Sequence, residues 1–250
     1  MHSDETTNVN ILLSNLRANN DENIVLIKTG ALNPVHRSHI SNLVQTKQYL
    51  EDVYHFHVLG GYISPTHDEY VYLKLRDDWI TGECRIAMCE KAIEEAGQQS
   101  WLSVDKAECM AKEFVDLSIV SSSLQKFIND KLKLSTPIRV IYVCGLDLFN
   151  RCGGLRSLRY SKMGVAVVYR PGEQETIVKQ AVIKDSNIFY VPIKDEIKWT
   201  LEDVSSTLIR KTLKNNQSCE HLTYTSVIDY LRTIPIRPLK HKCIVDEKDE

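Results

Sequence analysis

Two kinds of apolar pattern alternate along the chain: short, nearly continuous apolar runs, and longer segments in which apolar residues recur every three or four positions. The continuous runs, which are typical of buried strands, occupy residues 24–27, 53–63, 101–105, 139–145, 164–170 and 187–192. The three-to-four spacing, which is typical of amphipathic helices, begins at residue 40 and recurs over 76–97, 117–128, 204–213 and 225–232. This alternation predicts an α/β fold with a doubly wound parallel sheet and helices on both faces.

The same pattern predicts where the domain begins and ends. Residues 1–22 are polar and are expected to form a frayed extension or a short leading helix. Residues 23–234 predict a single domain, long enough to bury a sizeable core, and residues 235–250 predict a polar tail. The basic stretch RPLKHK (237–242) in that tail is either a solvated surface segment or a weak nuclear-import patch.

Composition narrows the classes of function. The net charge is −2, so the chain lacks the basic excess of a nucleic-acid-binding protein. No apolar run approaches the ~18–20 residues that a membrane span needs, and the polar amino terminus does not predict a secretory signal. The seven cysteines form no C-x-x-C pair, which predicts reduced thiols and no structural zinc site. We therefore expect a cytoplasmic or nuclear protein whose partners include neither nucleic acid nor a membrane.

The segment KTGALNPVHRSHISNL (28–43) joins the first predicted strand to the first predicted helix. Gly30 is expected to form a tight turn, and Pro34 to enter the helix, where its missing N–H is not needed. His36 and His39 would share the first helical turn, where backbone N–H groups and the helix dipole favour an anion. The pair would contact a phosphate, bind a metal or simply pack. Because no third ligand recurs at a suitable spacing, we expect no metal site.

Polar residues also follow other predicted strands. They include the ISPTHDEY loop (63–70), Gly145 with Asp147, and Arg170. In a doubly wound sheet, ligands bind beyond the carboxyl ends of the strands, where the strand order reverses. These loops are therefore expected to converge on one binding site.

A second helix start with phosphate-binding chemistry lies in VSSTLIRK (204–211). Ser206 and Thr207 with their backbone amides would bind phosphate and Arg210 would add a cation, or the serines would be ordinary helix caps. The chain contains neither G-x-G-x-x-G nor G-x-x-x-x-G-K-[ST], so the usual dinucleotide-binding and P-loop sites lose their main support. It also lacks H-E-x-x-H and G-x-S-x-G.

Taken together, GALNPVHRSH, ISPTHDEY, WLSVD, GLDLF, VVYRPG and VSSTLIRK resemble, in order and rough spacing, the motifs of nicotinamide/nicotinate mononucleotide adenylyltransferases. These enzymes are nucleotidyltransferases with a (T/H)-x-G-H motif and a C-terminal I-S-S-T-x-x-R motif. The resemblance covers roughly residues 24–232 and implies a Rossmann-like fold. It also implies transfer of the adenylyl group of ATP to a pyridine mononucleotide, giving NAD or deamido-NAD and pyrophosphate in NAD biosynthesis.

The resemblance implies roles for particular residues. The implied catalytic residues are His36, His39 and Arg210. The implied ATP-binding residues are Gly30, Ala31, Asn33, His36, His39, Gly145, Asp147, Ser205, Ser206, Thr207 and Arg210. The implied mononucleotide-binding residues are Leu32, Ser64, Tyr70, Lys74, Trp101 and Arg170. The implied cofactor is Mg²⁺, held mainly by the ATP phosphates.

Three positions depart from the family pattern. Ser38 stands at the glycine of H-x-G-H, Leu32 stands at a usual phenylalanine, and Ala107 replaces the tryptophan of V-D-x-W-E that would stack on the pyridine ring. Trp101 remains, and its indole face would attract a positively charged pyridine ring with ~0.5–2 kcal/mol. The alternatives are another nucleotidyltransferase, of the phosphopantetheine adenylyltransferase or cytidylyltransferase type, and a non-catalytic nucleotide-binding relative. The preferred mononucleotide and the formation of a homo-oligomer are left open.

Overall fold

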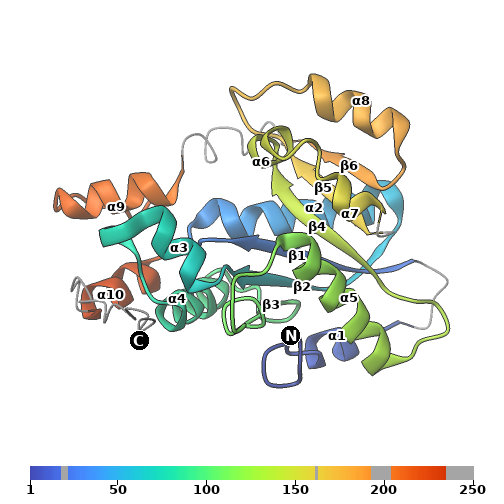
Figure 1. Cartoon of the computed structure of the whole chain (residues 1–250), viewed down its shortest axis with the longest axis horizontal. Helices are drawn as coiled ribbons and strands as arrows, with labels where there is room; N and C mark the ends of the chain where they lie inside the picture. Colours follow the sequence, from blue (N-terminus) through green and yellow to red (C-terminus); the bar gives the residue numbers. More distant parts are fainter. Residues whose placement is uncertain (18–21, 161–162, 193–203, 235–250) are drawn as a thin grey trace, which may run out of the picture.

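Six parallel strands form one sheet in the computed structural model of the protein, which describes residues 1–17, 22–160, 163–192 and 204–234 (Figure 1). The strands are β1 (Asn23–Gly30), β2 (His57–Pro65), β3 (Leu102–Val104), β4 (Arg139–Gly145), β5 (Gly164–Val168) and β6 (Ile188–Val191). They lie in the order β3-β2-β1-β4-β5-β6, and every neighbouring pair is parallel. The six predicted strands and the doubly wound parallel sheet are thereby confirmed.

Helices cover both faces of the sheet, as predicted. One face carries α2 (Arg37–Tyr54), α4 (Gly82–Glu95) and α10 (Thr225–Thr233). The other face carries α1 (Asn10–Ser14), α5 (Leu117–Leu132), α6 (Leu146–Arg151), α7 (Arg156–Tyr160) and α8 (Thr176–Lys184). Side-chain alternation along β1 shows the division, because Ile24 and Leu26 pack on the first face while Val25 and Ile27 pack on the second.

The remaining elements lie at one end of the sheet. They are α3 (Asp68–Leu75), a 3₁₀ helix η1 (Arg76–Asp78) and α9 (Ser206–Lys214). In Figure 1, α9 (orange) lies beside α3 (teal). Asp78 holds the two segments together, since it forms ion pairs with Arg210 and Lys214 of α9.

The structure corrects two boundaries in this region. Residues 68–70, expected in a loop, begin helix α3. The first turn of this helix carries two acidic residues, which interact favourably with the helix dipole. The single helix expected over residues 76–97 is broken before Gly82. Arg76 adopts a left-handed φ of 49° and Trp79 is extended, so the chain changes direction before α4 starts.

Two further differences concern segments whose local pattern is weak. Helix α2 continues to Tyr54 and ends where His55 adopts a φ of 55°, so the strand expected from residue 53 begins only at His57. Helix α8 was not predicted. It buries only Val178, and a helix with so small a buried face gives little periodic signal.

The amino-terminal segment packs on the domain and is not frayed over residues 1–17. Thr7 Oγ1 donates a hydrogen bond of 2.7 Å to Asp105 Oδ1, and Ser64 Oγ donates one of 2.9 Å to Asp105 Oδ2. His2 Nε2 lies 3.3 Å from the same carboxylate. Leu12 of α1, the short leading helix that the sequence allowed, is fully buried.

The structure bears on only some of the predictions about the cysteines, the tail, membrane spans and domain boundaries. Six of the seven cysteines lie in the described part of the chain, and all six are free thiols. Cys243 and the predicted tail, residues 235–250, lie outside it. Among the described helices, none has the length and apolar character to cross a membrane. The predicted domain boundaries stay a prediction.

Candidate functional site

The strand order reverses between β1 and β4, and a cavity of about 820 Å³ opens beyond the carboxyl ends of these strands. Its lining includes Lys28, Thr29 and Gly30 of β1 and Gly145 at the end of β4. Further lining residues come from the start of α2, from α3 and the residues before it, from the loop before α5, from α6, and from the segments after β5 and before α9. The site therefore lies where a doubly wound sheet is expected to bind a ligand.

The loop between β1 and α2 differs in detail from the prediction. Gly30 ends β1, and the left-handed residue of the loop is Leu32, with a φ of 48°. Pro34 precedes the helix, which begins at Arg37. Leu32, predicted to bind the mononucleotide, is only 1% exposed and packs in the core instead.

Buried polar groups hold this loop in place. The amide of Asn33 donates to the Asp78 carbonyl at 2.7 Å, and its Oδ1 accepts from the Ile80 N–H at 2.9 Å. Arg85, whose side chain is fully buried, donates to the carbonyl of Ala31 at 3.0 Å. Asn33, predicted to bind ATP, is therefore a support of the loop and does not line the cavity, whereas Ala31 does.

His36 and His39 both line the cavity at the start of α2. His36 is the N-cap residue, and its backbone N–H donates to His39 Nδ1 at 3.1 Å. Because Nδ1 of His39 accepts this bond, the proton of the neutral ring lies on Nε2. The two rings lie with their centroids 3.7 Å apart. His36 Nδ1 is buried and has no hydrogen-bond partner among the described residues.

Burial and neighbouring cations keep both rings neutral. Burial lowers the pKa of His36 to about 3, with smaller contributions from Lys28 and Arg170. The pKa of His39 also lies well below its usual value, because of burial and then because of His36 and Lys28. At neutral pH the pair therefore offers hydrogen bonds to an anion but no positive charge.

Lys28 is a cavity residue that the sequence interpretation did not assign. It lies two positions before the end of β1 and is only 8% exposed. Burial lowers its pKa. The signal was present in the sequence, since a lysine that continues the buried apolar run 24–27 is unusual.

The VSSTLIRK segment contributes to the site in a different way from the one predicted. Ser205 caps α9, accepts a bond from Leu208 N–H and lines the cavity. Ser206 Oγ donates to the carbonyl of Pro34 at 2.8 Å, and Arg210 Nη1 donates to that of Asn33 at 2.8 Å. None of Ser206, Arg210 and the exposed Thr207 lines the cavity. Ser206 and Arg210 instead hold the β1–α2 loop through these hydrogen bonds.

Four further predicted residues line the cavity, three of them at its β4 and β5 side. Gly145 and Asp147 line it, and so does Arg170, which lies 3.3 Å from Asp147. Arg151, which was not predicted, lines the cavity and lies 3.4 Å from the other oxygen of Asp147. The fourth predicted residue is Lys74 of α3, which also lines the cavity and has a pKa lowered mainly by burial.

Two further residues of the mononucleotide-binding prediction lie outside the cavity lining. Trp101 is 7% exposed and packs in the core, where its indole N–H donates to Gln98 Oε1 at 2.6 Å. It precedes β3, so it lies at the amino end of that strand, away from the cavity edge. Ser64 is fully buried and uses its hydroxyl on Asp105. The geometry therefore does not support a pyridine ring that stacks on Trp101.

An exposed aromatic pair occupies the cavity instead. Tyr70, which was predicted, and Phe114, which was not, both line it and stack with their ring centroids 5.0 Å apart. Each side chain is 42% exposed. Nothing in the local sequence pattern distinguishes Phe114 from an ordinary aromatic residue in a loop. Its position shortly before α5 brings it to the cavity.

Glu108 adds a buried carboxyl group to the cavity lining. Its Oε2 has no hydrogen-bond partner among the described residues. Burial raises the pKa of Glu108 to about 8, although a hydrogen bond with Thr66 opposes that shift. Glu108 is therefore mostly protonated at neutral pH.

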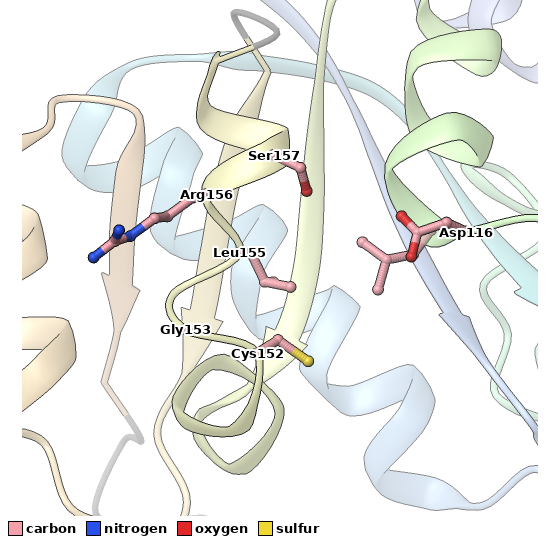
Figure 2. A pocket seen from close by; sticks show the side chains of 7 residues that line it. Asp116, Cys152, Gly153, Leu155, Arg156 and Ser157 are labelled. Atoms are coloured by element: carbon pink, nitrogen blue, oxygen red, sulfur yellow. The ribbon is translucent and has the colours of Figure 1, made fainter.

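A smaller cavity of about 450 Å³ adjoins the first and shares Asp116, Leu117 and Cys152 with it. Figure 2 shows the side chains of Cys152 and Leu155 directed toward Asp116, whereas Arg156 points away. This side cavity extends the site toward the start of α5 and carries no cation directed into it.

Comparison with known proteins extends the resemblance found in the motifs. No protein-family model matches the chain. The nicotinamide/nicotinic acid mononucleotide adenylyltransferase of Arabidopsis thaliana is 26% identical over 84% of this chain and 87% of the relative. The enzyme of the same name from Oryza sativa subsp. japonica is 29% identical over 83% of each chain. The resemblance predicted from the motifs is thereby confirmed.

Solved structures give the same fold. The nicotinic acid mononucleotide adenylyltransferase of Plasmodium falciparum, complexed with APC, has a TM-score of 0.60 and 15% identity, covering 84% of this chain and 94% of its own. Its complex with NaAD has a TM-score of 0.58. At this identity the likeness concerns the fold, and it confirms the expected Rossmann-like architecture.

The raised pKa of Glu108 makes a prediction about stability. Between the ordinary carboxyl pKa and about 8, the folded protein holds a proton that the unfolded chain releases, so stability falls as pH rises through this window. The slope from this group is up to ~1.4 kcal/mol per pH unit. We expect Glu108→Gln to lose that slope. The free energy of urea unfolding, measured at several pH values between about 5.5 and 7.5, gives the difference from wild type.

The control for this experiment is Glu113→Gln, which changes an exposed carboxyl group in the same segment. It should reproduce the wild-type pH dependence. Equal slopes in wild type and Glu108→Gln would contradict the assignment of a protonated Glu108.

Proposed function

We propose that this protein transfers the adenylyl group of ATP to nicotinamide or nicotinate mononucleotide and releases pyrophosphate. The observation that carries the proposal is the cavity at the β1/β4 switch point, where two histidines, two helix starts and several cations meet an exposed aromatic pair. The histidines, helix starts and cations suit a polyphosphate, and the aromatic pair suits a pyridine ring. Support also comes from relatives named for this reaction, which the chain resembles over most of its length.

The reaction needs no base from the protein. The phosphate of the acceptor is the nucleophile, and with a second pKa of ~6 it is largely dianionic at neutral pH. One of its oxygens forms a bond to the α-phosphorus of ATP. The bond from that phosphorus to the oxygen bridging to the β-phosphate breaks, and pyrophosphate leaves with the electron pair. Catalysis then depends on holding two polyanions together and stabilising the negative charge as it moves.

In this mechanism the start of α2 binds the phosphates of ATP. His39 donates from Nε2, because its Nδ1 is occupied by the His36 backbone N–H. The buried Nδ1 atom of His36 has no hydrogen-bond partner among the described residues. Arg170 follows β5, which lies two strands from β1 in the sheet. It lines the cavity and supplies positive charge. Arg210 acts as a positioning residue, since it holds the loop that carries His36.

Magnesium would enter with ATP. Among the described residues, no group of three histidine, cysteine or carboxylate side chains could hold a metal ion. Asp147 lines the cavity but is already paired with Arg151 and Arg170. An Mg²⁺ ion that enters with ATP would neutralise part of the charge of its phosphates.

The acceptor would place its ring at the aromatic pair. Tyr70 and Phe114 are exposed to the cavity, and an aromatic face attracts a cationic pyridine ring. Lys74, whose Nζ lies 5.9 Å from the centre of the Tyr70 ring, is placed to meet the acceptor's phosphate. Glu108 and Asp116 lie in the same lining and offer hydrogen bonds to a polar substituent of the ring.

The test is pyrophosphate release from ATP and Mg²⁺ with nicotinamide mononucleotide, nicotinate mononucleotide or phosphopantetheine as separate acceptors. We expect release with a pyridine mononucleotide together with the matching dinucleotide. Release only with phosphopantetheine would replace the proposed acceptor. ATP binding with no release in any reaction would favour the non-catalytic relative.

His39→Ala is expected to lower kcat by ~10²–10³, the usual effect of removing one donor to a transition-state anion. His221→Ala, at an exposed position far along the chain, is the matched control and should turn over like wild type. Steady-state kinetics on both variants, after thermal unfolding confirms that each is folded, decide the role of His39. Near-normal turnover by folded His39→Ala would remove His39 from the mechanism.

Phe114→Ala is expected to raise KM for the mononucleotide about 5–30-fold and to leave KM for ATP nearly unchanged, because an aromatic face contributes ~1–2 kcal/mol to a cationic ring. Trp101→Phe is the matched aromatic control and should lower Tm without raising that KM, because Trp101 is a core residue. The opposite result, with KM responding to Trp101 and not to Phe114, would restore the interpretation made from the motif.

A further inference from the structure

We propose that Lys28 is a catalytic residue whose ammonium group contacts the phosphates of the bound nucleoside triphosphate. The inference deepens the proposed function and rests on it for the identity of the ligand. The motifs that carry the family resemblance begin after Lys28, so they assign it no role.

The position of Lys28 follows from the alternation of β1. Ile24 and Leu26 pack on the face of the sheet that carries α2, and Lys28 continues this series. Thr29 belongs to the opposite series, and its hydroxyl lies 2.9 Å from that of Tyr142. Lys28 is therefore on the α2 side, where the start of that helix provides His36 and backbone N–H groups at the cavity lining.

Lys28 has no counter-ion in the described part of the chain. No carboxylate of these residues forms an ion pair with it, and Asp147, the one carboxylate that favours its charged form, is paired with Arg151 and Arg170. An ammonium group that is only 8% exposed is costly without a partner. A polyphosphate in the cavity would supply that partner, so the position of Lys28 suits a multiply charged anion.

Burial is the main cause of the neutral state of the histidines, and the charge of Lys28 adds to it. Lys28 lowers the pKa of both His36 and His39, next to the larger effect of burial. The groups that act on Lys28 itself are Cys144 and Asp147, which favour its charged form, and Arg170, which opposes it. Lys28 thus adds a buried ammonium group to the cations of the cavity lining, beside two rings that remain neutral.

The experiment compares ATP with adenosine as ligands of Lys28→Met, in the absence of any acceptor. We expect calorimetry to show a loss of at least tenfold in ATP affinity and a change within about twofold in adenosine affinity. Lys47→Met is the matched control, because Lys47 lies on α2 outside the cavity and pairs with Glu51. A folded Lys28→Met protein that binds ATP like wild type would overturn the inference.

A second readout tests whether Lys28 carries its positive charge beside the histidines. In Lys28→Met, the pKa values of His36 and His39, followed by NMR of the ring protons, should rise because a nearby positive charge is gone. Unchanged ring titrations together with unchanged ATP affinity would leave Lys28 a buried structural lysine and refute the proposal.

If Lys28→Met does not fold, the wild-type protein still provides a test. With ¹³C-labelled lysine, the signal of Lys28 is recognised by a lowered pKa that persists in Lys74→Met, since Lys74 is the other described lysine with a lowered pKa. Saturation with inorganic tripolyphosphate should raise the pKa of that signal toward the ordinary ~10.4. An unchanged titration would overturn the inference.

These outcomes can be told apart from failure of the proposed function. If no dinucleotide is formed but ATP affinity depends on Lys28, the acceptor is wrong and the role of Lys28 stands. If wild type and Lys28→Met form the dinucleotide equally well, the role of Lys28 is wrong and the proposed function stands.

Discussion

The binding site depends on the hydrogen bonds that hold the loop between β1 and α2. Arg85 reaches this loop from α4 and donates to Ala31, while it also pairs with Asp68 of α3 at 2.6 Å. Arg210 reaches it from α9 and donates to Asn33. Helices α4 and α9, which are distant in sequence, are thereby fixed to one short loop, and α3 is joined to it through Arg85. A buried guanidinium group with all its partners present stabilises such an arrangement, and losing one partner would be costly. The orientation of His36 follows from this framework.

Electrostatics in the cavity follow from the same burial. His36, His39 and Glu108 are all mostly neutral at neutral pH, because desolvation opposes their charged forms. Positive charge is confined to residues with long flexible side chains, such as Lys28 and Arg170. An entering polyanion would therefore raise the pKa of the histidines and couple proton uptake to its binding.

The sequence predicted the sheet better than it predicted the site. Apolar runs reveal strands because burial on both faces is a local property of each strand. The residues at strand ends, such as Gly30 and Gly145, could also be placed, because topology alone brings them to one edge. Trp101 and Phe114 could not be distinguished in this way: one precedes β3 and the other follows it, and only the latter meets the cavity. Arg210 looks like a phosphate ligand in sequence, but its partner Asp78 is 132 positions away.

The contact between the amino terminus and Asp105 has a practical consequence for handling the protein. Asp105 directly precedes the segment that carries Glu108 and Phe114, and Thr7 and Ser64 bind its two oxygens. Shortening the chain by its first eight residues would remove Thr7 and His2 from that carboxylate and loosen one wall of the cavity. Met1, by contrast, is 45% exposed, so an affinity tag fused ahead of it has room to extend into solvent. Expression designs should therefore lengthen this end and never trim it.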